Sequence, residues 1–192
     1  MEETHREAIQ KLWKRKLDQD ERGLPQSERH RNLEPDSAEF LCALASGCRP
    51  RRLMEVGGSS GISTIALAEA ARRAEGRLLS LEIEPARQAE AKETIASLGL
   101  GPWVEFVLGD AGELIPAYGD LDFVLIDCEK ADYIRFFDML RISPEAIIVA
   151  DNILSHDLRD YVAHVRARRD TESVTLPVGK GLEVTRISMM AE

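Results

Sequence analysis

The stretch Leu53-Met-Glu-Val-Gly57-Gly-Ser-Ser-Gly61 decides how the chain is expected to fold. An apolar run opens it and the Ala-rich residues 62–73 follow with helical spacing, so the pattern predicts a strand, a glycine turn and a helix. Gly57 and Gly61 would let the backbone turn tightly and approach a ligand, which the first free N–H groups of the helix would face. Such a turn also occurs as plain structure, so alone it leaves ligand binding open.

The glycine spacing argues against two common nucleotide sites. The G-x-G-x-x-G motif of dinucleotide enzymes needs three glycines, but with Gly58 and Gly61 as the last two, Val56 stands at the first position. The Lys-Ser/Thr pair of a phosphate-binding P-loop is also missing. The turn is therefore interpreted as the opening of an α/β cofactor site of another kind.

Two acidic residues follow at the ends of the next two predicted strands. Glu82 stands about 20 residues beyond the turn, where Rossmann-like folds place an acid on ribose hydroxyls. Starting a helix is its alternative role, although Glu84 suits that role better because Glu82 should still lie on the strand tip. Asp110 follows the strand predicted at 104–108. With the amide of Ala111 it could reach an adenine edge, or it could simply cap a helix.

Two further predicted strands end in carboxylates. Asp127 follows the apolar run Asp122–Ile126, and Asp151-Asn152 follows the run at 146–150. Adjacent parallel strands lie about 4.8 Å apart, so two carboxylates and an amide oxygen would converge at the edge where open α/β sheets bind ligands. Oxygen ligands without Cys or His favour Mg²⁺ or a similar cation. Either aspartate alone could instead cap a helix, but capping explains the pair with Asn152 less well.

Lys130 comes three residues after Asp127, at the start of the next predicted helix. Its amine can therefore reach the same pocket, and a lysine beside a cation and partly desolvated can act as a base. The alternative is a solvated surface lysine paired with Glu129 or Asp132, which is the commoner situation for a lysine taken alone.

Taken in order, these motifs resemble the cation-dependent O-methyltransferases that use S-adenosylmethionine, typified by catechol and caffeoyl-coenzyme A O-methyltransferases. The resemblance extends from about Leu53 to Ile187. Each motif is common alone, whereas all of them in order at the family's spacing are specific. The resemblance implies an α/β, Rossmann-like class I methyltransferase fold: a seven-stranded, mainly parallel sheet with the last strand antiparallel and helices on both faces.

The resemblance also implies a role for each site residue. It assigns cofactor binding to Glu55, Gly57, Gly61, Ser63, Glu82, Asp110, Ala111 and Asp127. Within that set, Ser63 stands where the family has a hydroxyl residue that meets the cofactor's carboxylate. It assigns ligation of the metal to Asp127, Asp151 and Asn152, and it makes Lys130 the catalytic base.

The implied reaction is an in-line methyl transfer from S-adenosylmethionine to a hydroxyl of a small catechol-like or other vicinal-diol acceptor. A divalent cation, for which Mg²⁺ is the leading choice, would bind two neighbouring acceptor oxygens and lower the pKa of the hydroxyl. A methyltransferase acting on a modified nucleoside or RNA is one alternative. A non-catalytic regulator that binds S-adenosylmethionine is another, although a pure binder has no evident need for the metal ligands and the lysine together.

The chain departs from the family's pattern around the acceptor. Many members carry a long covering insertion after the Asp-Asn pair, but residues 153–157 run quickly into a predicted helix. Lys180 occupies a hairpin position where the family often has Asp, and Cys128 and Glu129 identify no acceptor. His156 could line the pocket, or it could be a solvated loop histidine.

The composition fits a folded enzyme without a nucleic-acid surface. The chain has 192 residues, of which 44% are hydrophobic, a formal net charge of −9 and a pI of about 5.1. No apolar run approaches the roughly 20 residues of a membrane span, and the N-terminus shows no signal-peptide core. Three cysteines match no zinc spacing and leave one unpaired, so we expect a reducing cytoplasm. The expected partner is a small hydroxylated acceptor; no membrane partner is expected, and the acidity of the chain disfavours nucleic acid.

Two segments are expected. Residues 1–35 form an N-terminal helical extension and possible lid, and residues 36–192 form the S-adenosylmethionine-dependent methyltransferase domain. The extension places apolar residues at helical spacing, but an isolated helix of this length is marginal. It therefore needs a packing partner, which could be its own domain, the cofactor or a second subunit, so a homodimer is possible.

Overall fold

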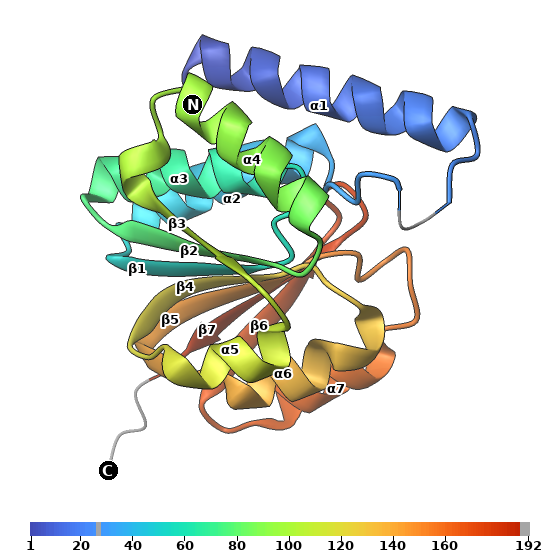
Figure 1. Ribbon diagram of the computed structural model, residues 1–192. Helices are drawn as coiled ribbons and strands as arrows, with labels where there is room; N and C mark the ends of the chain where they lie inside the picture. Colours follow the sequence, from blue (N-terminus) through green and yellow to red (C-terminus); the bar gives the residue numbers. More distant parts are fainter. Residues whose placement is uncertain (26–27, 189–192) are drawn as a thin grey trace.

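Seven strands form one sheet through the centre of the molecule, and helices cover both faces (Figure 1). The computed structural model describes residues 1–25 and 28–188. The strand order across the sheet is β3-β2-β1-β4-β5-β7-β6. The strands are β1 (Arg52–Val56), β2 (Arg77–Glu82), β3 (Val104–Leu108), β4 (Leu121–Ile126), β5 (Ile142–Ala150), β6 (Thr171–Leu176) and β7 (Leu182–Ile187).

The strand directions confirm the predicted sheet. β1 pairs in parallel with β2 and β4, and β4 pairs in parallel with β5. β7, the last strand, runs antiparallel to both of its neighbours, β5 and β6. The chain winds outward from β1 to β3 on one side and then returns to β4 on the other. The strand order therefore reverses between β1 and β4, the place where open α/β sheets bind ligands.

The helices divide between the two faces of the sheet. In Figure 1, α1 to α4 lie above the sheet, and α5, α6 and α7 lie below it. None of the helices in the described part of the chain could cross a membrane. Their bounds are α1 (Glu3–Glu21), α2 (Pro35–Cys48), α3 (Ile62–Ala74), α4 (Pro85–Ser97), α5 (Ala111–Leu114), α6 (Tyr133–Met139) and α7 (Arg159–Ala167), with short 3₁₀ turns η1 (Gly101–Trp103), η2 (Ile115–Ala117) and η3 (Lys130–Asp132).

The central strand β4 is buried on both faces and supplies two separate cores. Phe123 and Leu125 pack in the core beneath α1, α2 and α3, whereas Val124 and Ile126 pack in the core above α6 and α7. All four side chains are fully buried. A parallel strand covered on both faces reads as a continuous apolar run, which is why the sequence identified it. The two cores hold the carboxyl end of β4 in place.

Helix α1 shares a core with the rest of the domain. Ile9 and Leu12, which are 2% and 6% exposed, join the apolar cluster that contains α2 and α3. The carboxylate of buried Glu69 on α3 lies 3.4 Å from the ring of His5. Of the three packing partners expected for the N-terminal helix, the structure therefore shows the first, its own domain.

Replacing Ile9 by Ala tests how much α1 contributes to folding. Loss of a buried isoleucine leaves a cavity, so the free energy of unfolding should fall by about 2–4 kcal/mol. Urea denaturation followed by circular dichroism measures it. Leu17→Ala on the same helix is the matched control: its side chain is 47% exposed, and the change should stay within about 0.5 kcal/mol. Equal small losses in both variants would contradict a shared core.

Candidate functional site

A cavity of about 470 Å³ opens where β1, β2, β3 and β4 end. The place between β1 and β4 where the strand order reverses borders this cavity. The residues at these strand ends that line it are Val56, Gly57, Leu81, Glu82, Gly109, Asp110 and Asp127. The sequence and the structure thus agree on which edge of the sheet carries the site.

The glycine turn after β1 passes directly against the end of β4. Gly57 has a φ of 94°, and a Cβ atom there would lie 2.1 Å from the main-chain oxygen of Asp127. Only glycine fits that contact and that backbone angle. Gly61, with a φ of 109°, then begins α3 at its N-cap. The turn and the loop after β4 are therefore held together as one wall of the cavity.

Glu55 and Ser63 lie beneath the turn rather than on the cavity wall. Glu55 is fully buried, and the Thr64 hydroxyl donates a hydrogen bond to its Oε1 at 2.6 Å. Burial raises the pKa of the Glu55 carboxyl, while the hydroxyls of Ser63 and Ser80 oppose that shift. Glu55 and Ser63 thus contact each other below the turn. Direct contact of either residue with a cofactor stays a prediction.

Glu82 points into the cavity from the tip of β2. Its two carboxylate oxygens accept hydrogen bonds from three main-chain amides, those of Ser59 at 2.7 Å, Ile83 at 3.0 Å and Glu84 at 2.9 Å. Glu84 precedes α4 and makes no side-chain capping bond there. Glu82 is therefore fixed as an acceptor at the cavity wall, in agreement with its placement on the strand tip.

Asp110 takes one of the two roles that the sequence left open, that of a helix cap, and its contact with an adenine edge stays a prediction. Its side chain caps α5 by accepting the amide hydrogen of Gly112 at 2.6 Å. Asp110 and Ala111 also line the cavity. The capping bond uses one carboxylate oxygen, Oδ1, and fixes the side chain at the rim.

Asp127, Asp151 and Asn152 form one hydrogen-bonded cluster, in which Asp127 and Asn152 line the cavity and Asp151 is fully buried. The side-chain nitrogen of Asn152 donates to Asp151 Oδ2 at 2.5 Å and to Asp127 Oδ1 at 3.3 Å. Asn152 has a φ of 67°, a conformation that Asn tolerates better than most residues. The two carboxylates and the amide group therefore lie together as predicted, but the side-chain nitrogen of Asn152, and not the predicted oxygen, faces the carboxylates.

The two carboxylates are held in an environment that disfavours their charge. Burial, followed by the proximity of Asp127, raises the pKa of Asp151 to about 8. Burial likewise raises the pKa of Asp127. Oδ1 of Asp151 is buried and has no hydrogen-bond partner within the described residues.

These donors fit a hard divalent cation. Two carboxylates and an amide that can turn its oxygen inward match the preference of Mg²⁺ for oxygen ligands. A cation would also supply the partner that Asp151 Oδ1 lacks. The described residues contain no cluster of three or more His, Cys, Asp or Glu that could hold a metal, so the candidate site depends on Asn152 as its third protein ligand.

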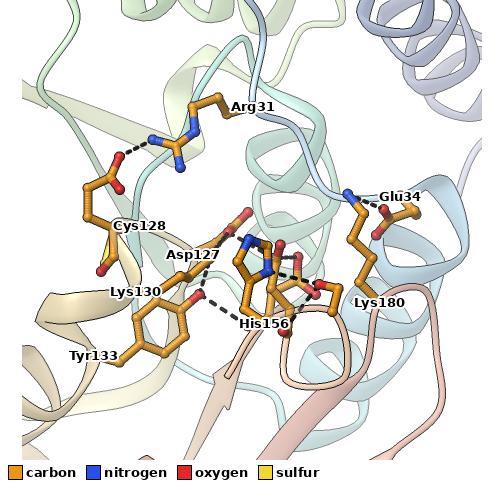
Figure 2. Close-up of polar contacts among 12 residues, drawn as sticks. Arg31, Glu34, Asp127, Cys128, Lys130, Tyr133, His156 and Lys180 are labelled. Atoms are coloured by element: carbon orange, nitrogen blue, oxygen red, sulfur yellow. Dashed lines mark hydrogen bonds and ion pairs between the residues drawn. The ribbon is translucent and has the colours of Figure 1, made fainter. Parts of the chain in front are cut away.

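Lys130 reaches the same cluster from η3. Its Nζ lies 3.3 Å from Asp127 Oδ1 and 2.8 Å from the hydroxyl oxygen of Tyr133. The side chain is 19% exposed, so the alternative of a solvated surface lysine is wrong. Figure 2 shows Lys130 beside Asp127 and Tyr133, the two residues that its amine contacts.

Residues 28–34, here called the N-terminal strap, contact the glycine turn beside the cavity, and the sequence did not identify their contacts. The side-chain oxygen of Gln19 accepts the amide hydrogen of His30 at 2.8 Å. Arg31 donates its amide hydrogen to the Ser59 hydroxyl at 3.0 Å, and Asn32 donates to the Ser60 hydroxyl at 2.8 Å. The strap is polar and lacks a periodic pattern, so no local signal marks these contacts.

The strap also borders the metal end of the cavity. Arg31 forms an ion pair with Glu129, and Glu34 forms one with Lys180 at 2.8 Å. His156 lines the cavity and is also exposed, so both of its expected descriptions hold. The function of residues 1–35 as a lid stays a prediction.

Comparison with known proteins gives the family. Residues 9–185 match the O-methyltransferase family. The chain belongs to that family. A catechol O-methyltransferase of Niastella koreensis is 35% identical over 130 residues, which are 64% of this chain and 58% of that protein. A catechol O-methyltransferase of Mycobacterium tuberculosis is 35% identical over 126 residues, which are 64% of this chain and 57% of its own length. The chain therefore matches less than two thirds of these relatives.

Solved structures of O-methyltransferases share the fold of this family member. TomG from Streptomyces achromogenes, solved with S-adenosylmethionine, has a TM-score of 0.78 at 24% identity, over 93% of this chain and 89% of that one. The Podospora anserina methyltransferase PaMTH1, solved with S-adenosylhomocysteine, has a TM-score of 0.81 at 20% identity, over 98% and 89%. Both support the Rossmann-like methyltransferase fold that the sequence predicted.

The pKa of Asp151 predicts how the metal-free protein responds to pH. The folded state holds a proton up to about pH 8, whereas the unfolded chain loses it near pH 4. This contribution to stability is therefore complete below pH 4 and lost as pH rises to 8. With chelator present, the free energy of unfolding should fall by roughly 1–3 kcal/mol between pH 5 and pH 8.

Urea denaturation at several pH values measures this trend, and Asp151→Asn is the matched control. The amide cannot ionise, so the variant should show a flatter pH dependence and a higher stability than the wild type at pH 8. Parallel curves for the two proteins would show that Asp151 is not the group responsible.

Proposed function

We propose that this protein is a Mg²⁺-dependent O-methyltransferase that moves the methyl group of S-adenosylmethionine to a hydroxyl of a small catechol-like or other vicinal-diol acceptor. The observation that carries the proposal is one polar cluster in which Asp127, Lys130 and Asn152 line the cavity and Asn152 also donates to buried Asp151. Family membership and the similarity to proteins named catechol O-methyltransferase support it.

The other end of the cavity suits the cofactor. Glu82 would accept a ribose hydroxyl, since it lines the cavity and its Oε2 accepts only one main-chain hydrogen bond, which leaves that oxygen one lone pair. Asp110 and Ala111 would border the adenine, and the glycine turn from Gly57 to Gly61 would hold the methionine portion. The presence of S-adenosylmethionine or its product in two structures of the same fold supports this choice of cofactor.

The metal end suits the acceptor. Asp127, Asp151 and Asn152 would hold the cation, and a bound divalent cation lowers the pKa of a hydroxyl. Two neighbouring acceptor oxygens could share one such cation, which favours vicinal diols over simple phenols. The protein positions the acceptor oxygen in line with the methyl group and limits its motion.

Lys130 would remove the acceptor proton. Its amine stands beside Asp127 at the edge of the cavity, close to where a metal-bound hydroxyl would lie. The proton would move from the acceptor oxygen to Nζ. S-adenosylmethionine would supply the methyl group to that oxygen and would leave as S-adenosylhomocysteine. The regulator alternative gives no role to this lysine or to the buried carboxylates.

The remaining proposals concern setting and assembly. The cysteines Cys42, Cys48 and Cys128 are all free, which supports a reducing, cytoplasmic environment. A small hydroxylated molecule is the proposed partner. Homodimer formation stays a prediction.

Methyl transfer from labelled S-adenosylmethionine to a panel of catechols tests the proposal directly. With Mg²⁺ present, we expect transfer to catechols and no transfer to the corresponding phenols with a single hydroxyl. Excess chelator should abolish the transfer, and restored Mg²⁺ should recover it. Cofactor binding without transfer to any diol, or transfer that is indifferent to chelator, would contradict the proposed function.

Two substitutions separate the base from the metal site. Lys130→Ala should lower kcat by about 10²–10⁴-fold, because general base catalysis is lost, while Mg²⁺ and cofactor affinities stay unchanged by calorimetry. Asp151→Ala should instead weaken Mg²⁺ binding. Lys14→Ala on the exposed surface of α1 is the control for loss of a lysine. Wild-type turnover in both site variants would rule out the assigned roles.

A further inference from the structure

Tyr133 links the predicted base to the strand that carries two of the predicted metal ligands (Figure 2). Its hydroxyl accepts a hydrogen bond from Lys130 Nζ at 2.8 Å and donates one to the main-chain oxygen of Asp151 at 3.1 Å. We propose that Tyr133 is a positioning residue that holds the Lys130 amine in place beside the acceptor hydroxyl. This inference rests on the proposed function and adds to it a role for a residue outside the predicted site.

The ring of Tyr133 is tightly packed, so its hydroxyl is held in one place. Tyr133 is the first residue of α6 and is fully buried in the core between the sheet and α6 and α7. Its ring packs edge to face against Tyr161, with ring centroids 5.5 Å apart and an interplanar angle of 86°. Lys130 is a flexible side chain, so a bond to this hydroxyl ties its amine to a rigid core.

The hydrogens around the Lys130 amine determine which way it points. The single hydroxyl hydrogen of Tyr133 goes to the Asp151 carbonyl, so toward Lys130 the oxygen can only accept. A second N–H of Lys130 is directed to Asp127 Oδ1 at 3.3 Å.

The nitrogen of Lys130 has three positions besides its bond to Cε. Two of them are directed at Tyr133 and Asp127, so one position remains. Lys130 lines the cavity, so that position is where an acceptor hydroxyl would approach. When the proton moves from the acceptor oxygen to Nζ, the amine becomes an ammonium group whose third N–H fills this position.

Without the tyrosine hydroxyl, the amine loses one of its two anchors. Asp127 alone would still attract it, but rotation about the Cδ–Cε and Cε–Nζ bonds could then turn an N–H toward the acceptor. Such an amine still binds near the metal site yet is seldom aligned as a base. The expected defect is therefore in turnover rather than in binding.

Tyr133→Phe tests this role. Loss of a hydrogen bond to an amine that must be aligned should lower kcat by about 10- to 100-fold. The KM values for cofactor and diol, and the Mg²⁺ affinity measured by calorimetry, should stay within about twofold. Tyr161→Phe is the matched control, because Tyr161 is equally buried in the same core and its hydroxyl has no hydrogen-bond partner within the described residues. Its kcat should equal that of the wild type.

A double-mutant cycle separates positioning from general damage to the fold. If Tyr133 acts through the Lys130 amine, Tyr133→Phe should have no further effect on kcat in the Lys130→Ala background. A structural role would lower kcat again in that background and would also weaken Mg²⁺ binding.

A second readout needs no turnover. In nitrogen-15 NMR of the protein without ligands, the Lys130 ammonium signal, assigned by its loss in Lys130→Ala, should be protected from exchange with water. Tyr133→Phe should abolish this protection, and Tyr161→Phe should keep it. A signal equally protected in all three proteins would overturn the inference.

The outcomes distinguish this inference from the proposed function. An active wild type whose kcat is unchanged by Tyr133→Phe would overturn the positioning role alone. A wild type that transfers no methyl group to any diol, although the Lys130 signal is protected, would overturn the proposed function and the positioning role with it.

Discussion

The main-chain ladder that continues past the ends of β1, β4 and β5 is the constraint on which the site depends. The amide of Asp127 donates to the Val56 oxygen at 3.0 Å, and the amide of Asp151 donates to the Ile126 oxygen at 3.1 Å. These two bonds extend the parallel pairing by one residue beyond the strand ends. Asp127 and Asp151 therefore stand at equivalent positions after neighbouring strands. Gly57 allows the turn after β1 to press against this ladder, where any side chain would collide with the Asp127 oxygen.

The ladder also makes the site unfavourable for the protein without a ligand. It places two carboxylates side by side in a buried position, and the raised pKa of Asp151 expresses that cost. The amine of Lys130 and the side-chain nitrogen of Asn152 offset part of it. A divalent cation would offset more, since it favours the charged form of both aspartates. The geometry thus couples metal affinity to the loss of a proton.

The sequence predicted the sheet and the strand-end residues because both follow from local patterns. Buried parallel strands read as apolar runs, and Glu82, Asp127 and Asp151 each stand where such a run ends. The strap contacts could not be found in this way, because they join residues far apart in a segment without periodicity. Tyr133 lies between these cases: its spacing of three from Lys130 was visible, but its bond to the Asp151 carbonyl depends on how β5 pairs with β4.

The strap is held differently at its two ends. At the cofactor end, the side chain of buried Asn32 and the main-chain amide of Arg31 donate hydrogen bonds to the hydroxyls of the glycine turn. Breaking such bonds leaves polar groups without partners. At the metal end, it is held by two ion pairs whose lysine and arginine are 40% and 33% exposed, and exposed pairs contribute little to stability. The hydrogen bonds to the glycine turn therefore hold the strap more firmly than the ion pairs to Glu129 and Lys180 do.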